Sequence, residues 1–400
     1  MSHLGYMEKL LDGVEVEWTV LGDENFVEVA NSGRKPVKSS LRVPGNTPYY
    51  GANNIQDYVD GHTHDGEYVL IAEDGSASLD RYSVQYTTGR FWANNHVHVV
   101  RGKLGLNTRY LYHYLSTVNF IPFLTGGGRA KLTKGNMIEI PIPIPCPANQ
   151  KKSLKVQAEI VRILDTFTEL TAELTAELTA RQQQYAYYRD ELLTFEEGEV
   201  EWKELSELTL STSNIKWSDT DSVYRYIDLS SVSRENNKIT ETTEITAENA
   251  PSRAKKLVEK DDVIFATTRP TQQRICLIDD EYSGGVVSTG YCVLRANPSA
   301  VIPKWIYFYL SSSNFKTYLE DVQSGSAYPA VSDAKVKSFK IPIPPISEQK
   351  RIVSILDKFD ALTTSLTEGL PREIELRQQQ YEYYRDLLLS FPKPEVASHD

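Results

Sequence analysis

The sequence RQQQYAYYRD at residues 181–190 and the sequence RQQQYEYYRD at residues 377–386 differ at a single position. The repeat extends upstream, because IVRILD at residues 160–165 returns as IVSILD at residues 352–357. A repeat of nearly 200 residues is too long for one unit of a solenoid. The chain is therefore predicted to contain two whole domains, each followed by the same kind of helix and related by a pseudo-two-fold.

The repeat is circular. YLYHYLS at residues 110–116 matches WIYFYLS at residues 305–311, and GVEVEW at residues 13–18 resembles GEVEW at residues 198–202. The copy at 198–202 directly follows the first long helical segment, whereas the copy at 13–18 opens the chain and the last helix ends without one. Reading from the end of the chain back to its start completes the pattern, so the termini are predicted to lie close together.

The composition supports two or three hydrophobic cores and carries an excess of acid. The 400 residues are 40% hydrophobic, with a formal net charge of −11. Residues 1–150 hold 13 basic and 15 acidic side chains, residues 200–345 hold 17 and 19, and the helical segments 151–199 and 346–400 carry net charges of −4 and −3. Because phosphate neutralisation supplies most non-specific affinity, the chain alone should bind nucleic acid weakly. Any DNA-binding face must be local, with basic partner subunits supplying further charge.

The sequence predicts a cytoplasmic chain without a disulfide or zinc site. It contains no run of 18 apolar residues, and the N-terminal MSHLGYMEKLLDG lacks a basic region followed by an apolar run. The cysteines Cys146, Cys276 and Cys292 show no CxxC spacing.

No catalytic residue is predicted. The chain lacks a GxxxxGK[ST] phosphate loop and the Asn-Pro-Pro-aromatic or Asp-Pro-Pro-aromatic motif of amino-methyltransferases. His62 and His64 lack helical metal-ligand spacing. Asp190 followed by Glu201 and Lys203 has a nuclease-like spacing, but the repeat-related segment 17–19 contains no lysine, which favours an ordinary structural interpretation.

Each domain ends in a proline-rich strap that leads into a long helix. The straps are IPIPIPCP at residues 140–147 and IPIPP at residues 341–345, where alternating proline forbids helix and favours an extended chain. Residues 154–195 contain no glycine or proline and space their apolar residues three or four apart. The second helix runs from residue 347 to about 390 and is interrupted at residues 369–371. The two apolar stripes predict an antiparallel coiled pair.

The fold class predicted is α/β (α+β): two mixed domains joined by two long antiparallel helices in a pseudo-two-fold circular repeat. Residues 68–72 match residues 262–266, and residues 97–101 match residues 291–295. All four segments are rich in β-branched residues and are expected to be buried strands.

Polar segments next to these strands are candidates for a ligand face. ATTRPTQQR at residues 266–274 follows a buried strand and offers arginine and glutamine, which contact guanine and adenine bidentately. The segments 91–96 and 286–290 correspond to each other, as do the loops 126–131 and 325–330. The ligand-face candidates are Asn94, Asn95, His96, Arg129, Lys131, Thr267, Thr268, Arg269, Gln272, Gln273, Arg274, Thr289 and Tyr328.

The chain resembles the DNA-specificity subunit of type I restriction–modification enzymes. The resemblance rests on the duplicated domain, the TAEL tetrads at residues 171–178, the QYxYYRD segments, and the run ATTRPT…STGYCVLR within residues 266–295. It implies a first target-recognition domain at 1–150, a central spacer helix at 151–198, a second target-recognition domain at 199–345 and a C-terminal spacer helix at 346–400.

The resemblance implies a DNA-binding subunit without catalytic residues. Each domain would bind half of a split double-stranded target, and the helices would set the spacing and bind two methyltransferase subunits. These partners use S-adenosylmethionine, and motor-nuclease subunits use ATP and magnesium. The alternatives are a protein-interaction scaffold without DNA and a self-contained methyltransferase or nuclease. Candidates for docking or helix pairing are Gln184, Tyr185, Tyr188, Arg189, Gln380, Tyr381, Tyr384 and Arg385.

Overall fold

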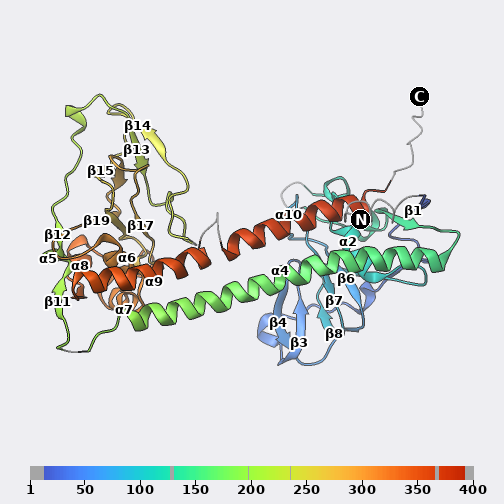
Figure 1. Ribbon diagram of the computed structural model, residues 1–400. Coiled ribbons are helices and arrows are strands. Elements are labelled where there is room, and N and C mark those ends of the chain that lie inside the picture. The colour runs from blue at the N-terminus through green and yellow to red at the C-terminus, as the bar shows by residue number, and fades with distance from the viewer. Residues whose placement is uncertain (1–12, 127–129, 197, 235, 365–368, 392–400) are drawn as a thin grey trace. The chain divides into compact units, whose positions relative to one another are not determined.

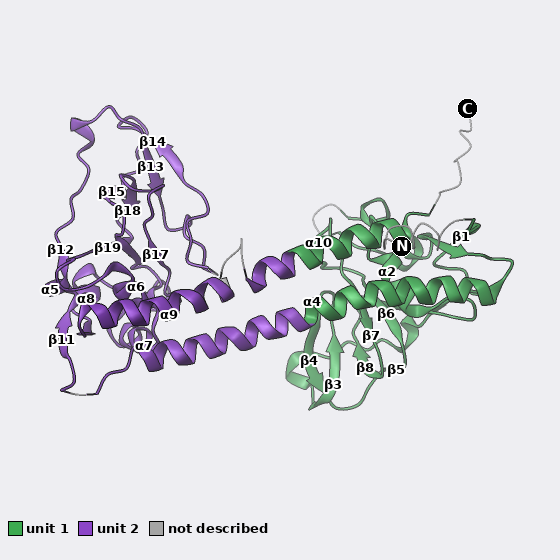
Figure 2. Ribbon diagram, in the orientation of Figure 1, with its two compact units in different colours: residues 1–172, 376–400 green, residues 173–375 purple. Residues whose placement is uncertain are grey.

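The computed structural model describes residues 13–391, apart from residues 127–129, 197, 235 and 365–368. The chain forms two compact units (Figure 2). Unit 1 comprises residues 1–172 and 376–400, and unit 2 comprises residues 173–375. The boundaries fall inside the long helices, because each half of the central helix packs against a different domain.

Unit 1 contains two four-stranded sheets. The first has the order β2 (Val27–Val29), β9 (Val97–Gly102), β6 (Tyr68–Ala72) and β7 (Val84–Thr87). The second has the order β4 (Ile55–Val59), β3 (Pro44–Tyr50), β8 (Arg90–Ala93) and β5 (His64–Asp65). Strands β3 and β8 are parallel, and the other pairs are antiparallel.

Unit 2 repeats this topology strand for strand. Its first sheet has the order β12 (Thr209–Leu210), β19 (Tyr291–Ala296), β16 (Val263–Ala266) and β17 (Ile275–Leu277). Its second sheet has the order β14 (Thr243–Ile245), β13 (Tyr224–Ile227), β18 (Val286–Ser288) and β15 (Ala254–Leu257), with β13 and β18 parallel. The predicted duplication is therefore confirmed, including the buried strands β6, β9, β16 and β19.

Short helices complete each unit. In unit 1, α2 (Thr108–Leu115) contains the YLYHYL segment of the repeat, and in unit 2 its counterpart is α6 (Pro303–Ser311). The remaining short helices are α3 (Lys134–Met137), α5 (Leu205–Leu208), α7 (Ser313–Val322) and α8 (Asp333–Lys337), with 3-10 turns η1 (Asn31–Gly33), η2 (Ser39–Leu41), η3 (Ile121–Phe123), η4 (Trp217–Asp219) and η5 (Pro270–Gln272).

Each strap forms one strand of a two-stranded ribbon. β10 (Pro141–Pro145) pairs antiparallel with β1 (Val16–Val20), and β20 (Lys340–Ile343) pairs with β11 (Glu201–Glu204). In the first strap, the N–H of Cys146 donates to the carbonyl of Glu15 at 2.7 Å, so the backbone groups of its even-numbered residues face β1. The prolines at the odd positions face away from β1, where a missing N–H costs no ladder bond.

The long helices begin and end close to the predicted positions. The central helix is α4 (Gln150–Leu192), and the second is divided into α9 (Ile346–Thr364) and α10 (Leu370–Leu389) (Figure 1). The break falls at Gly369, whose φ of +80° favours glycine, followed by Pro371 in the first turn of α10.

The helices pair through aromatic contacts within each unit. In unit 1, Phe167 of α4 stacks on Tyr384 of α10 with ring centroids 5.2 Å apart. In unit 2, Tyr185 and Tyr188 of α4 stack on Phe359 of α9 at 6.4 and 6.2 Å. These pairs are equivalent in the repeat, so each half of α4 has its own partner helix.

The first and last described elements meet in unit 1. Trp18 of β1 and Phe391, which follows α10, line the same cavity. The terminal residues themselves lie outside the described residues. Among the described residues, no helix combines the length and apolar content needed to cross a bilayer.

Candidate nucleic-acid interface

Hydrogen bonds bring three candidate segments of unit 2 together beyond the end of β16. The N–H and hydroxyl of Thr267 donate to the carbonyl of Gly290 at 2.8 and 2.9 Å. The N–H of Arg269 donates to the carbonyl of Pro329 at 2.7 Å. Residues far apart in the sequence therefore share one surface.

Five candidates on this surface have exposed side chains. Tyr328 is 73% exposed, and the guanidinium of Arg269 lies 5.7 Å from its ring centroid. Thr268, Gln272 and Thr289 are also exposed. We name this set, Thr268, Arg269, Gln272, Thr289 and Tyr328, the unit 2 polar cluster. It combines the fork of arginine, an amide and an aromatic ring, groups that contact bases and phosphates.

The other three candidates in this region have side chains bonded inside the domain. Thr267 is 8% exposed and uses its hydroxyl on the backbone. The Gln273 amide nitrogen donates to the carbonyls of Leu310 and Ser312, each at 2.9 Å. The Arg274 guanidinium donates to the carbonyl of Leu229. These bonds favour Arg269 and Gln272 over Gln273 and Arg274 as ligand contacts.

The corresponding surface of unit 1 carries paired charges. Asn94 is 3% exposed and accepts a hydrogen bond from the N–H of His96 at 2.8 Å, while Asn95 and His96 are exposed. The His96 ring pairs with Asp74, and the Lys131 ammonium lies 3.0 Å from a Glu73 carboxylate oxygen. The candidate Arg129 lies outside the described residues.

Glu73 is the centre of the charge network in unit 1. It lies 2.6 Å from Arg34 and 3.7 Å from the buried ring of His98, besides its contact with Lys131. Burial disfavours its charged form, but hydrogen bonds from Arg34 and Lys131 outweigh burial and lower the pKa of Glu73. Burial also lowers the pKa of His98, so its ring is held neutral.

Glu73 and Asp74 are contacts that the sequence interpretation missed. The N–H of Glu73 donates to the carbonyl of His96 at 2.8 Å, as Thr267 does to Gly290. Ala72 and Ala266 are equivalent, so Glu73 and Asp74 stand where unit 2 has Thr267 and Thr268. Aligning the two repeats residue by residue would have identified them.

The docking candidates on the long helices are tyrosines that contact the partner helix and polar side chains that bond within their own helix. Tyr381 is 8% exposed, and its hydroxyl lies 3.4 Å from His113. Tyr185, Tyr188 and Tyr384 contribute to the helix pairs described above. Gln184 and Gln380 accept hydrogen bonds from arginines one turn away, and Arg189 and Arg385 bind the adjacent aspartates.

Two exposed tyrosines on the helices were not among the candidates. Tyr187 is 62% exposed and Tyr383 is 54% exposed, and they occupy equivalent positions of the repeat. Their presence in both copies was the signal available in the sequence. Large exposed aromatic rings are frequent anchors of protein interfaces.

Within the described residues, no group of three His, Cys, Asp or Glu side chains is arranged to hold a metal ion. The imidazole of His64 is 7% exposed and contacts the carbonyl of Ala30 at 3.0 Å and the hydroxyl of Thr63 at 2.8 Å. His64 therefore belongs to the packing of its domain.

Two domains of one topology, each with its own polar surface and each packed on a pair of long helices, define a duplicated recognition protein. The family model of the type I restriction modification DNA specificity domain matches residues 15–181 and 197–376. The chain belongs to this family. It is a type I restriction–modification specificity subunit, which contributes DNA sequence specificity and is not catalytic by itself.

Full-length relatives agree with this assignment. The chain is 44% identical to a Haemophilus influenzae protein assigned as a type I restriction enzyme specificity subunit, over 96% of this chain and 98% of the relative. It is 36% identical to the type I restriction enzyme EcoR124I/EcoR124II specificity subunit of Escherichia coli, over 100% of both chains. The solved S subunit of a type I restriction–modification system from M. genitalium shares the fold, with a TM-score of 0.57, 14% identity and coverage of 96% and 98%.

Proposed function

We propose that unit 1 and unit 2 each bind one half of a bipartite DNA target, so that this subunit directs adenine methylation and restriction by partner subunits. One observation carries the proposal. The two units share strand order and loop register, yet the surface beyond β6 carries His96 paired with Asp74 and Lys131 paired with Glu73, whereas the surface beyond β16 carries the exposed Thr268, Arg269 and Tyr328. A shared scaffold with different exposed groups is what two different half-sites require.

The charge distribution supports assembly before tight DNA binding. The domains are nearly neutral and the helical segments are acidic. Phosphate contacts dominate affinity, whereas base contacts provide specificity. This subunit would therefore contribute base contacts, and basic partners would contribute most phosphate contacts.

The repeated helices support binding of two methyltransferase subunits, one at each helix pair. Tyr187 and Tyr383 occur in equivalent exposed positions, so the same partner surface can be used twice. The partners would use S-adenosylmethionine, ATP and magnesium, while this chain binds none of them directly. Motor-nuclease subunits would complete a cytoplasmic complex.

Methylome sequencing tests the proposal directly. The host gene should produce one methylated motif made of two short halves separated by an unread gap. Replacing residues 199–345 with the corresponding domain of another specificity subunit should change one half and preserve the other. A purified chain that methylates DNA without partners would contradict the subunit assignment. If both halves of the methylated motif are unchanged in the chimaera, the proposal that each unit binds one half is contradicted.

A further inference from the structure

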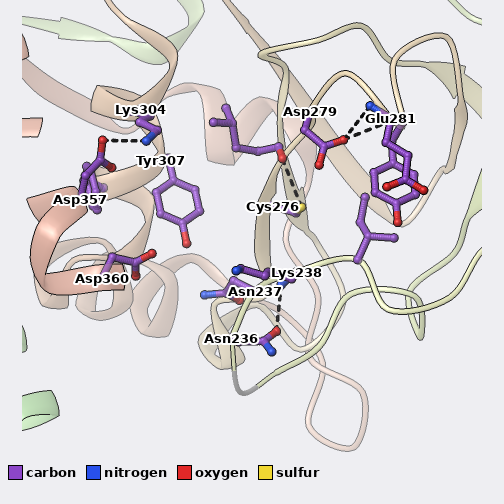
Figure 3. A pocket seen from close by; sticks show the side chains of 14 residues that line it. Asn236, Asn237, Lys238, Cys276, Asp279, Glu281, Lys304, Tyr307, Asp357 and Asp360 are labelled. Carbon is purple, nitrogen blue, oxygen red and sulfur yellow. Dashed lines mark hydrogen bonds and ion pairs between the residues drawn. The ribbon is translucent and has the colours of Figure 1, made fainter. Parts of the chain in front are cut away.

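A cavity of about 390 Å³ lies within unit 2 (Figure 3). Lys304 and Tyr307 of α6 and Asp357 and Asp360 of α9 line one side of it. Residues 236–239 and 276–282 supply the remaining wall. The volume lies within the range of small-molecule sites and exceeds what one water molecule needs.

A guanidinium group occupies the equivalent place in unit 1. The Arg109 guanidinium carbon lies 4.4 Å from the ring centroid of Tyr86 and 4.8 Å from that of Tyr112. A terminal nitrogen of the same group lies 2.8 Å from a carboxylate oxygen of Asp165. The cation therefore lies against two tyrosine rings, whose centroids are 5.8 Å apart and whose planes are tilted by 49°, and it is paired with an aspartate.

The sheet register shows which ring unit 2 has lost. Val69 of β6 pairs with Tyr86, and the equivalent Val263 of β16 pairs with Leu277. Leu277 thus stands in the position of Tyr86 and lines the cavity. A leucine side chain is smaller than a tyrosine ring, so this exchange leaves space.

The helices show the second loss. Unit 2 keeps the second tyrosine and the aspartate, because Tyr307 corresponds to Tyr112 and Asp357 corresponds to Asp165. Lys304, however, stands in the position of Arg109. The Lys304 ammonium lies 2.6 Å from Asp357. An ammonium is compact and lacks the planar fork of a guanidinium, so it cannot fill the space that the Arg109 guanidinium takes beside the tyrosine rings of unit 1.

The cavity has also gained a negative charge. Asp360 stands where unit 1 has Thr168. Burial raises the pKa of the Tyr307 hydroxyl most, and the negative charge of Asp360 raises this pKa further. Glu281 is compensated by Arg225 at 2.8 Å. The charged lining residues are Lys238, Asp279, Glu281, Lys304, Asp357 and Asp360. Four carboxylates stand against two ammonium groups of the lining and the guanidinium of Arg225, so the net charge is negative and favours a cation.

We propose that this cavity binds a guanidinium group, which stacks on Tyr307 and is neutralised by Asp357 and Asp360. The group belongs either to a free guanidino compound or to an arginine side chain of a bound subunit. The inference concerns unit 2 alone and stands apart from the proposed division of the DNA target. Its basis is the filled counterpart in unit 1, which shows the chemistry that this framework accepts.

Agmatine, a guanidino amine, is the probe, and isothermal titration of the purified full-length chain is the measurement. Cadaverine is the control, since it is a similar dication without a planar fork. We expect one agmatine site and at least about tenfold weaker binding of cadaverine, a difference equal to about 1.4 kcal/mol. Equal binding of both amines, or no agmatine binding at millimolar concentrations, would overturn the proposal.

Two sets of variants locate the site. Leu277→Tyr with Lys304→Arg, which copies unit 1, should fill the cavity with the chain's own guanidinium and weaken agmatine binding at least about tenfold, and Asp360→Asn should weaken it several-fold. The reverse exchange, Tyr86→Leu with Arg109→Lys, should create a second site in unit 1. Thermal unfolding checks that each variant is folded. Unaltered affinity in the folded variant with both Leu277→Tyr and Lys304→Arg contradicts the assignment. If that variant fails to fold, a stoichiometry of one in the folded reverse variant contradicts it instead.

Titration of the assembled complex distinguishes the sources. Loss of agmatine binding when methyltransferase subunits are bound, restored by an arginine-to-alanine change in those subunits, identifies an arginine side chain as the occupant. Retained binding identifies a free guanidino compound. Both results support the guanidinium site.

Discussion

Arg269 has a left-handed backbone conformation, with φ of +50°, and Gln273 has φ of +44°. Such conformations cost about 1–3 kcal/mol in non-glycine residues and persist where surrounding contacts hold them. Here the bond from the Arg269 N–H to Pro329 and the two bonds from the Gln273 side chain hold the loop. The backbone at Arg269 is therefore fixed before any ligand binds, which reduces part of the ordering cost of binding.

Arg269→Ala should relax specificity in one half of the DNA target. Loss of one bidentate contact costs about 1–3 kcal/mol for the base concerned, while the half-site bound by unit 1 should be unaffected. Binding of the assembled complex to oligonucleotides with single substitutions in each half measures the effect. A uniform loss across all sequences would mean that Arg269 contacts phosphate.

Arg274→Ala is the matched control. Its guanidinium bonds to the carbonyl of Leu229, so truncation should lower the unfolding free energy of unit 2 by about 1–3 kcal/mol and leave base preference unchanged. Chemical denaturation measures the stability, and the same oligonucleotide panel measures the preference. A change of base preference without loss of stability would reverse the assignments of the two arginines.

His113 gives unit 1 a dependence on pH. Burial lowers the pKa of His113, although its bond to Asp165 opposes the shift, and Arg109, Arg385 and Tyr381 also face the ring. In the unfolded chain the pKa of this histidine is about 6.5. The unfolded state therefore binds more protons in the window below about 6.5, and the unfolding free energy falls as pH falls, by at most about 1.4 kcal/mol per pH unit.

His113→Phe should reduce this slope, because phenylalanine does not titrate. Unit 2 has Phe308 at the same position, so the fold accepts the ring. Unfolding between about pH 8 and 5.5 measures it, a range in which Asp165, whose pKa is lowered, stays ionised. His98 is also buried with a lowered pKa and leaves a residual slope in the variant. An unchanged slope would show that His113 is protonated or solvated in the folded protein.

At the scale of elements, α4 is one uninterrupted helix of 43 residues that contributes to both units. Its TAEL tetrads carry leucines that are half-buried, such as Leu174 and Leu178, rather than fully buried. A helix of this length spans roughly 65 Å. If the two units bind two half-sites as proposed, a change in the length of α4 should alter the spacing of those half-sites.

Deleting Thr175, Ala176, Glu177 and Leu178 should shorten α4 by about 6 Å, which corresponds to one or two base pairs of duplex. We expect the gap of the methylated motif to change while both half-sites persist. Methylome sequencing of a strain carrying the deletion decides the matter. Replacing Thr175, Glu177 and Leu178 with alanine, which preserves length, should leave the gap unaltered. An unchanged gap after deletion would refute the spacer role.

Tyr187→Ala and Tyr383→Ala test partner binding at the two helix pairs. Each single change should weaken one of two methyltransferase sites by about 2 kcal/mol or more, and the double change should weaken both. Native mass spectrometry of the assembled complex gives the stoichiometry. Tyr58→Ala is the control, because Tyr58 is 54% exposed but lies on β4. Full occupancy in the double variant would place the interface elsewhere.

At the scale of the whole molecule, the elements that repeat were the ones the sequence predicted best. The core strands, the proline straps and the helix break at Gly369 follow from periodicity and from the backbone limits of proline and glycine. The inward turn of Gln273 and Arg274 could not be predicted, because it depends on carbonyls more than 35 residues away. The cavity of unit 2 could not be predicted either. Leu277, which lines it, is matched to Tyr86 only by the strand pairing seen in the structure.

The straps have a consequence for the free subunit before it meets its partners. The outer edge of β10 carries prolines, which cannot donate, and the carbonyls of Pro143 and Pro141 already accept the hydroxyls of Tyr110 and Tyr114. An edge without N–H donors, on which two carbonyls are already bonded, is a poor template for a strand of another chain. Addition of a strand of another chain along β10 is therefore disfavoured before the partners bind.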